Sequence, residues 1–330
     1  MGIKNLMKFL TSKAPDCITP IEIQNLNGKT IAKDAYISLY QFLIATNFSK
    51  SNKTLSDPQG NPTAHLIGIL NNTLTYAKNN IQVIWIFDGI APNIKQGTLD
   101  KRNESRQKNY EMMQNAVKED DVKNINKHAA RSLYLTEESI RDAKMLLKYL
   151  GQRWVDADNE AEALCAQMCK SGVVDYAWSE DMDSLAFGAP KMLRGNKSLT
   201  EISLEKVLSS LQLTHNQFID LCILLGCDYC PTIKGVGQVT AHELILKYKN
   251  LDSILEALSS NPTLNKKYTV PNEFPYKLAQ DFFSQEINQN PINKFVVSPK
   301  DLEDFLVLQR AFSQAKVDKY IKSLLNYNPQ

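Results

Sequence analysis

The sequence carries almost no net charge, because 38 Lys and Arg oppose 36 Asp and Glu, which leaves +2 in 330 residues. A protein that binds a polyanion through its overall charge would be far more basic, so any polyanion-binding face must come from local clustering. Apolar runs are also short, well below the roughly 20 residues that a membrane span needs. The composition therefore excludes a general polycation and predicts no membrane contact.

Cysteine is sparse, and its spacing does not favour a metal or redox site. Cys227-Asp-Tyr-Cys230 is a C-x-x-C string, but a zinc site needs a second ligand pair and none has a suitable spacing. A redox motif would follow a strand and begin a helix, whereas this string follows an apolar helical run. We therefore expect six reduced thiols in an intracellular protein.

Acidic residues, in contrast, occur where carboxylates are chemically useful. Several directly follow apolar, strand-like runs, and in an open parallel sheet the strand ends meet along one edge, where ligands bind. Like charges brought together there repel by roughly 4 kcal/mol per close pair, and a divalent cation is the usual reason that such a cluster persists. The candidate metal ligands are Asp34, Asp88, Glu160, Glu162, Asp181, Asp183 and Asp228.

Alternating strand and helix patterns predict an α/β fold with a mostly parallel central sheet. Strand patterns cover residues 30–33, 83–87, 153–155 and 173–178, and helical patterns lie between them. Thr136 begins a helix that Gly151 ends. The tail has helical patterns near residues 274–284, 300–312 and 314–325.

Each acidic motif also has an ordinary structural interpretation. Asp34 and Asp88 could each be a helix N-cap, and Asn159-Glu-Ala-Glu162 fits a capping box. Glu180-Asp-Met-Asp183 could be a solvated acidic turn, although two carboxylates spaced two apart can also present their oxygens to cations. The repetition of acids at several strand ends favours a functional site.

Residues 91–135 differ from the rest, because they are polar and poor in large apolar side chains. The segment contains a run of cations that includes Lys95, Arg102 and Arg106. Such a run is usually a solvated helix face. Here it begins seven residues after Asp88, so it could also place cations over an anionic phosphate.

Two glycines, Gly235 and Gly237, stand between two helical patterns. Glycine allows a phosphate to approach the backbone closely, and the next helix presents free N–H groups. An ordinary turn between helices would have the same pattern, but the arrangement resembles a helix-hairpin-helix contact to DNA.

Taken together, these strings resemble the eukaryotic and archaeal flap endonucleases of the XPG-type structure-specific nuclease family. The resemblance covers most of residues 1–250. The matching blocks are Gly2-Ile-Lys-Asn-Leu6, Asp34 to Leu43, Phe87-Asp-Gly89 with Lys95 and Arg102, Asp156 to Ala163, Ser179 to Gly188, and Leu221 to Gly237.

The resemblance implies a PIN/resolvase-like nuclease core with helices on both faces of the sheet. The core would span residues 1–212 and include a helical arch at 91–135, through which a 5′ single strand threads. A helix-two-turn-helix at 213–260 would grip duplex DNA, and residues 261–330 would complete the single nuclease domain with helices.

The resemblance also implies an activity, which is two-metal hydrolysis of DNA phosphodiesters at 5′ flap junctions that leaves a 5′-phosphate and a 3′-hydroxyl. The seven acids would hold two Mg²⁺ ions, with Mn²⁺ as a substitute, and the turn at 232–237 would hold K⁺. Lys95, Arg102 and Asp181 would be catalytic. The DNA contacts would be Tyr40, Lys95, Arg102, Arg106, Gly235, Gly237 and Gln238.

The expected partner is DNA with a 5′ flap, nick or gap, handled by a nuclear monomer in replication and repair, with 5′–3′ exonuclease activity as well. The family also has a sliding-clamp partner, but Asn326 to Gln330 show no clamp-binding motif. Two alternatives are a mainly 5′–3′ exonuclease of the same family and a non-catalytic protein that binds DNA junctions.

Overall fold

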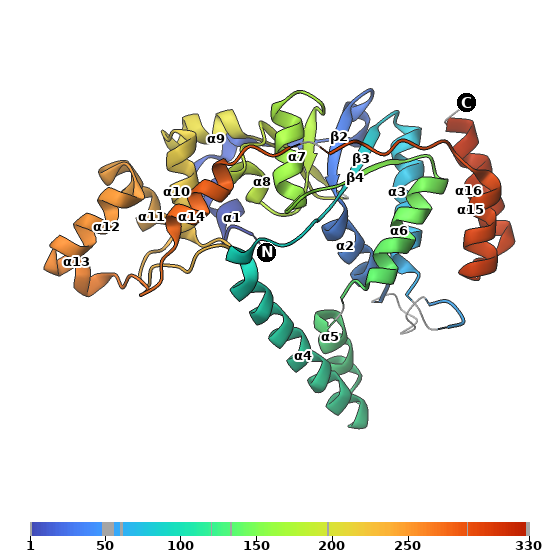
Figure 1. Ribbon diagram of the computed structural model, residues 1–330, viewed down its shortest axis with the longest axis horizontal. Helices are drawn as coiled ribbons and strands as arrows, with labels where there is room; N and C mark the ends of the chain where they lie inside the picture. Colours follow the sequence, from blue (N-terminus) through green and yellow to red (C-terminus); the bar gives the residue numbers. More distant parts are fainter. Residues whose placement is uncertain are drawn as a thin grey trace.

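The computed structural model describes residues 2–47, 56–59, 62–119, 121–132, 134–196, 198–288 and 290–327. A central sheet carries helices on both faces, and one helix pair projects away from the body (Figure 1). None of the helices in these ranges is both long enough and apolar enough to cross a membrane. The predicted α/β class is confirmed.

Seven strands form the sheet in the order β1-β7-β6-β5-β2-β3-β4. The five adjacent strands β6, β5, β2, β3 and β4 are parallel to one another. Strand β7 runs antiparallel to both of its neighbours, β6 and β1. The strands are β1 (Ile18–Ile21), β2 (Thr30–Asp34), β3 (Gln82–Phe87), β4 (Arg153–Asp156), β5 (Tyr176–Trp178), β6 (Lys191–Arg194) and β7 (Leu199–Ser203).

The two faces of the sheet carry separate hydrophobic clusters, because side chains alternate along each strand. On β3, Ile84 and Ile86 join one cluster and Trp85 and Phe87 the other. The first face is covered by α1 (Leu6–Lys13), α7 (Ala161–Lys170), α8 (Asp183–Ala186), α9 (Leu204–Leu211) and α10 (His215–Leu225). The second is covered by α2 (Ala35–Asn47), α3 (Ala64–Lys78), α6 (Glu137–Tyr149) and α16 (Gln314–Tyr327).

Residues 91–135 form a short turn, η3 (Asn93–Lys95), and two helices that pack side by side, α4 (Gln96–Lys118) and α5 (Val122–Ser132). His128 is buried, and its Nδ1 lies 2.9 Å from Asn109 Oδ1, which joins the two helices. The pair points away from the sheet (Figure 1), as expected for a segment with no apolar face that could join the core. We call this helix pair the arch.

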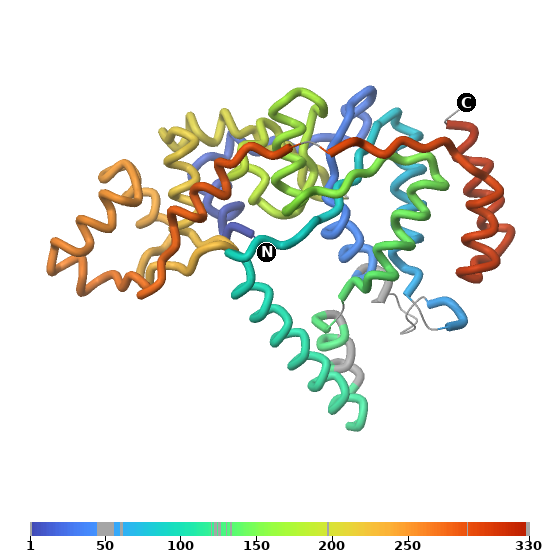
Figure 2. Tube along the Cα trace, in the orientation of Figure 1, coloured from blue at the N-terminus to red at the C-terminus, as the bar shows by residue number. Residues whose placement is uncertain are grey.

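The C-terminal third spans the molecule from end to end (Figure 2). After α11 (Gln238–Tyr248) come α12 (Leu251–Ser260), α13 (Pro262–Lys267) and α14 (Tyr276–Ser284), which packs against α10. The chain then crosses to α15 (Pro299–Glu303), a π-helical turn η4 (Asp304–Gln309) and α16, which packs on α3. The division into three domain segments remains a prediction.

Several predicted boundaries need correction. The strand expected at residues 173–178 begins only at Tyr176, because the three residues before it lie in a turn after α7. The single helix expected at 300–312 is a short α-helix followed by a π-helical turn. Thr136 does cap α6, since its hydroxyl accepts a hydrogen bond from the Ser139 amide at 3.0 Å.

Candidate active site

All seven predicted acids line one cavity of about 300 Å³. Asp34 ends β2 and Asp88 follows β3, and because these strands are parallel their carboxyl ends meet at the same edge of the sheet. β4 leads into α7 with its two glutamates, and β5 leads into the turn that carries Asp181 and Asp183. The sheet topology therefore gathers acids that lie far apart in the sequence.

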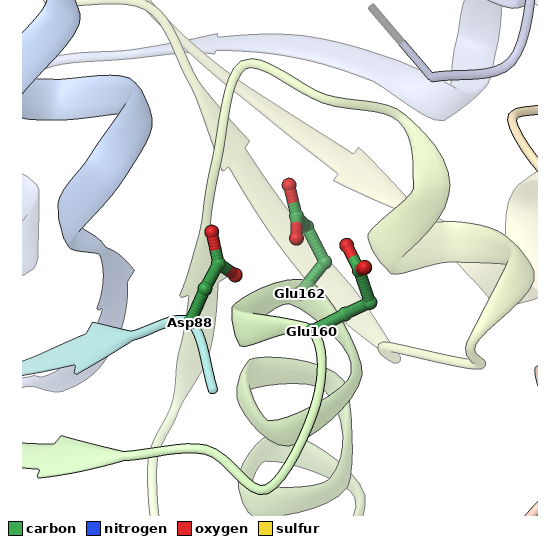
Figure 3. A group of neighbouring side chains, drawn as sticks. All are labelled: Asp88, Glu160 and Glu162. Carbon is green, nitrogen blue, oxygen red and sulfur yellow. The ribbon is translucent and has the colours of Figure 1, made fainter. Parts of the chain in front are cut away.

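Three of these carboxylates form the tightest group (Figure 3). One oxygen from each of Asp88, Glu160 and Glu162 lies within 4.8 Å of the other two. The Ala161 amide donates a hydrogen bond to Asp88 Oδ1 at 2.8 Å, so Asp88 caps α7 from a neighbouring strand. The alternative interpretation of Asn159 as the start of a capping box does not hold, because Glu160 occupies the N-cap position and makes no side-chain cap bond.

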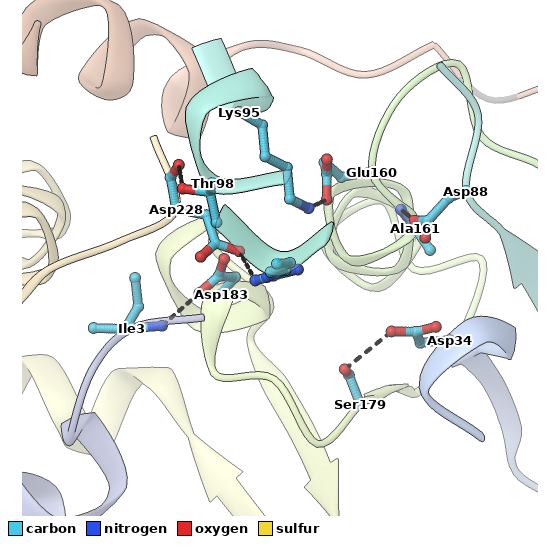
Figure 4. Close-up of polar contacts among 11 residues, drawn as sticks. Ile3, Asp34, Asp88, Lys95, Thr98, Glu160, Ala161, Ser179, Asp183 and Asp228 are labelled. Carbon is cyan, nitrogen blue, oxygen red and sulfur yellow. Dashed lines mark hydrogen bonds and ion pairs between the residues drawn. The ribbon is translucent and has the colours of Figure 1, made fainter. Parts of the chain in front are cut away.

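Hydrogen bonds from backbone amides hold Asp34 and Asp183, and Asp181 is positioned by its own amide. Asp34 Oδ1 accepts from the Ile37 amide at 3.1 Å, so Asp34 also caps α2 as the alternative interpretation had it. Asp183 Oδ1 accepts from the Ile3 amide at 2.8 Å, which brings the N-terminal segment to the site (Figure 4). Ser179 supports Asp181, since its Oγ accepts from the Asp181 amide at 3.0 Å.

Burial and like charge both disfavour ionisation of this cluster. Desolvation, with the negative charges of Asp34 and Glu160, raises the pKa of Asp88 to about 7. Desolvation also raises the pKa of Asp34 and Asp181, and raises that of Glu162 and Asp183 well above the usual carboxyl range. A cation that entered the cavity would relieve this repulsion.

The first turns of the arch place cations over the acids (Figure 4). Lys95 Nζ forms an ion pair with Glu160, and Arg102 Nη2 lies 2.5 Å from Asp228 Oδ2. Burial is the largest single influence and lowers the pKa of Lys95, but the ion pair and hydrogen bond with Glu160, together with the charges of Glu162 and Asp88, raise the pKa overall. Thr98 Oγ1 donates to the Asp228 carbonyl at 2.8 Å, which attaches α4 to the turn after α10.

Tyr40 and Arg106, two of the predicted DNA contacts, also line this cavity. Arg106 Nη2 donates to the Tyr40 hydroxyl at 2.9 Å, and its guanidinium carbon lies 5.8 Å from the centroid of the Tyr40 ring. Tyr40 is on α2 and Arg106 is on α4, so this pair joins the core to the arch. The two residues close one side of the cavity.

The remaining predicted DNA contacts lie outside the cavity. Gly235 has a φ of +92° in the turn between α10 and α11, and Gly237 is the N-cap of α11. Gln238 Nε2 donates to the Asn5 carbonyl at 3.5 Å, which ties this turn to the N-terminal segment. These residues form a separate element, and the structure does not bring them to the acids.

The site also contains residues that were not among the predicted site residues. Tyr36 and Leu135 line the cavity, and Gly2 approaches the acids so closely that an added Cβ would lie 1.4 Å from Asp181 Oδ1. Tyr36 and Gly2 both stand in sequence blocks that resemble the family. The resemblance did not indicate, however, that Gly2 meets Asp181.

The donor set suits a hard divalent cation. All seven acidic side chains offer oxygen ligands, which Mg²⁺ prefers. Asp181 Oδ1 is buried and has no hydrogen-bond partner in the part of the chain that the structure describes. A buried carboxylate oxygen without a partner is costly, and a bound cation would satisfy it.

Fold and pocket together define a class, the PIN-like α/β nuclease cores. Residues 1–109 match the XPG N-terminal domain family, and residues 151–228 match the XPG I-region family. The solved structure of flap endonuclease-1 from Methanococcus jannaschii superposes with a TM-score of 0.72 at 28% identity, covering 94% of this chain and 96% of that one.

Curated relatives agree with this class. Flap endonuclease 1 of Tetrahymena thermophila is 38% identical over 340 residues, which cover 99% of this chain and 88% of that protein. Flap endonuclease 1 of Plasmodium knowlesi is 37% identical over 98% of this chain, which spans only 58% of the relative's length. The chain belongs to the flap endonuclease branch of the XPG nuclease family.

Proposed function

We propose that this protein is a metal-dependent, structure-specific 5′ flap endonuclease. It hydrolyses DNA phosphodiesters at the junction of a duplex and a 5′ flap and leaves a 5′-phosphate and a 3′-hydroxyl. The observation that carries the proposal is the single cavity in which seven carboxylates face the cations of the arch. Relatives named flap endonuclease 1 along nearly the whole chain support the same substrate class.

The acids would hold two Mg²⁺ ions, with Mn²⁺ as a substitute. Asp34, Asp88, Glu160 and Glu162 line one part of the cavity, and Asp181, Asp183 and Asp228 supply the remaining ligands. When bound, such cations stabilise negative charge on the reacting phosphate and lower the pKa of a water molecule. In the family a K⁺ ion accompanies the turn between α10 and α11, and the proposal includes it.

Lys95 and Arg102 would act on the phosphate itself. Both reach over the acids from the base of the arch, where they now neutralise Glu160 and Asp228. A phosphate that entered the cavity would offer these cations a second anionic partner. Arginine can bind two phosphate oxygens at once, and lysine adds a compact positive charge. Their role would be to stabilise charge as it develops on the transferred group.

Tyr40 and Arg106 would hold the nucleotide next to the cut. An aromatic ring provides a stacking surface for an unpaired base, and the ring edge of Tyr40 is fixed by its hydrogen bond from Arg106. Farther away, Gly235, Gly237 and Gln238 would contact the duplex backbone at the start of α11. The protein would act as a monomer on nuclear DNA in replication and repair.

The test is cleavage of a double-flap DNA substrate, with products resolved to single nucleotides. We expect release of one short oligonucleotide in Mg²⁺, restored by Mn²⁺ and abolished by a chelator. Stepwise release of single nucleotides would instead indicate an exonuclease of the same family. If the protein bound the junction but did not cleave it with any divalent ion, it would be a non-catalytic junction-binding protein.

A further inference from the structure

A second concave surface lies outside the active site, along the exposed side of α6. It is a groove of about 380 Å³. Its lining residues are Glu137, Ile140, Arg141, Lys144, Met145, Lys148 and Trp154. We call it the α6 groove. It combines cations with apolar and aromatic side chains, and the activity described above does not use it.

The floor of the α6 groove is aromatic. The Trp154 ring packs edge-on against Phe87, with centroids 6.0 Å apart, and stacks on Phe295 at 6.2 Å. Lys144 Nζ lies 4.9 Å from the ring centroids of both Phe87 and Trp154 and 2.6 Å from Asp156 Oδ1. Lys144 is therefore fixed in place as part of the wall.

Two further cations flank this floor without a partner of their own. Arg141 and Lys148 are exposed, and with Lys144 they follow the i, i+3, i+7 spacing of one helix face. Across the described ranges neither side chain forms a hydrogen bond or an ion pair, and the groove lining has one carboxylate, Glu137. The α6 groove thus offers two available positive charges beside a tryptophan.

The α6 groove and the active-site cavity are lined by neighbouring stretches of the chain. Leu135 lines the cavity and Glu137 lines the groove, so one residue separates them along the chain. The two sites are also linked by rings, because Tyr36 in the cavity packs edge-on against Phe87 at 6.2 Å and Phe87 packs against Trp154. The arch leads directly from α5 into α6 (Figure 2).

We propose that the α6 groove binds the single-stranded 5′ arm of the substrate beyond the active site. The inference rests on the proposed function, which supplies such an arm. Single strands are bound by cations that track the backbone and by aromatic rings that contact the bases. The groove offers two available cations and one ring, Trp154, which stacks on Phe295 on one side. An acidic peptide would match the charge, but it would not account for the continuity with the catalytic cavity.

The first experiment removes the two available cations in Arg141→Gln/Lys148→Gln. Its control is Lys13→Gln/Lys206→Gln, which removes two exposed cations on α1 and α9. We expect affinity for an oligothymidylate to fall on the order of tenfold, and the salt slope to decrease by roughly 0.7 per cation lost, in the groove variant alone. Equal behaviour of the groove and control variants would overturn the inference.

A second measurement uses the chain's own fluorescence. Trp85 and Trp178 are 0% and 3% exposed, so contact quenching by a single strand should come from Trp154. Oligothymidylate should quench the wild type and leave Trp154→Phe unchanged. Quenching by an oligoglutamate peptide, with none by oligothymidylate, would assign the groove to a protein partner and contradict the proposal.

Cleavage assays separate this inference from the function on which it rests. With a long flap of roughly twenty nucleotides, the groove variant should need more substrate for half-maximal rate, whereas a one-nucleotide flap should be cut as by the wild type. If the wild type cuts no flap at all, the proposed function fails, while the oligothymidylate titrations still test the groove. If the cleavage rates of the groove variant and the wild type depended on flap length in the same way, the proposed role of the groove would be wrong.

Discussion

The floor and the roof of the active-site cavity are held in different ways. The floor consists of acids attached to strand ends and to α7 and α8, and most of their side chains are buried. The roof is the base of the arch, and among the described residues of α4 only Ala116 is buried. Core packing therefore fixes the floor, whereas ion pairs fix the roof. Substitutions in the floor should therefore abolish cleavage, whereas substitutions in the roof should lower its rate by smaller amounts.

The largest effect should come from the floor, in Asp181→Ala. This change removes the carboxylate whose buried Oδ1 has no protein partner among the described residues. We expect single-turnover cleavage to fall by about a thousandfold or more, because cation binding is lost, while flap binding stays within a few-fold.

The matched control for that change is Glu180→Ala. Glu180 is the neighbouring acid, but it pairs with Arg194 at 3.3 Å outside the cavity. This variant should cleave as the wild type does. Substantial turnover by Asp181→Ala would contradict the role given to the floor.

The next largest effect should come from the roof, in Lys95→Ala. Loss of this cation should lower the single-turnover rate by about a hundredfold and change affinity little, because it acts on charge that develops during the reaction. Lys101→Ala removes an exposed cation from the first turns of α4, the helix that Lys95 precedes, and should leave the cleavage rate unchanged. If Lys95→Ala weakened binding uniformly and left the single-turnover rate intact, Lys95 would be only a phosphate contact.

The floor should also make the metal-free protein sensitive to pH. The folded-state pKa of Asp88 is about 7, above its unfolded value near 4, so the folded state holds the proton more tightly across this window. The free energy of unfolding should therefore fall as pH rises from 4 to 7, by about 3 kcal/mol, and then level off. Urea titrations in a chelator measure this.

Two comparisons sharpen the pH experiment. Asp88→Asn should flatten the decline, because its side chain does not titrate. Mg²⁺ should stabilise the protein most above pH 7, where the acids are ionised. A free energy of unfolding that rose between pH 4 and 7 would contradict the repulsion assigned to the floor.

The smallest effects should come from changes to Tyr40, where the core and the arch meet. Two substitutions distinguish the role of its ring from that of its hydroxyl. Tyr40→Ala removes the ring and should slow cleavage about tenfold, since stacking on a base is lost. Tyr40→Phe keeps the ring and removes only the hydroxyl that accepts from Arg106 at 2.9 Å, so the rate should fall about twofold. Equal losses in both variants would show that the ring itself does not stack.

The positions of the floor acids were predictable from the sequence because they follow from strand periodicity. Asp34 and Asp88 come directly after apolar runs, and parallel pairing of β2 with β3 brings such positions together. Strands β1, β6 and β7 were missed. Because β7 runs antiparallel to both β6 and β1, this end of the sheet departs from the alternation of strand and helix on which the prediction rested. The capping box at Asn159 failed because a local pattern cannot show that Asp88, on another strand, takes the cap.

The sequence by itself determined the acidic character of the strand ends and the polar character of the arch, because both depend only on local residue order. The tertiary structure alone decided which groups meet: Gly2 with Asp181, Arg106 with Tyr40, and Trp154 with Phe87. Those contacts join residues far apart in the chain. Their distances are set by how helices pack on the two faces of the sheet, which no local pattern specifies.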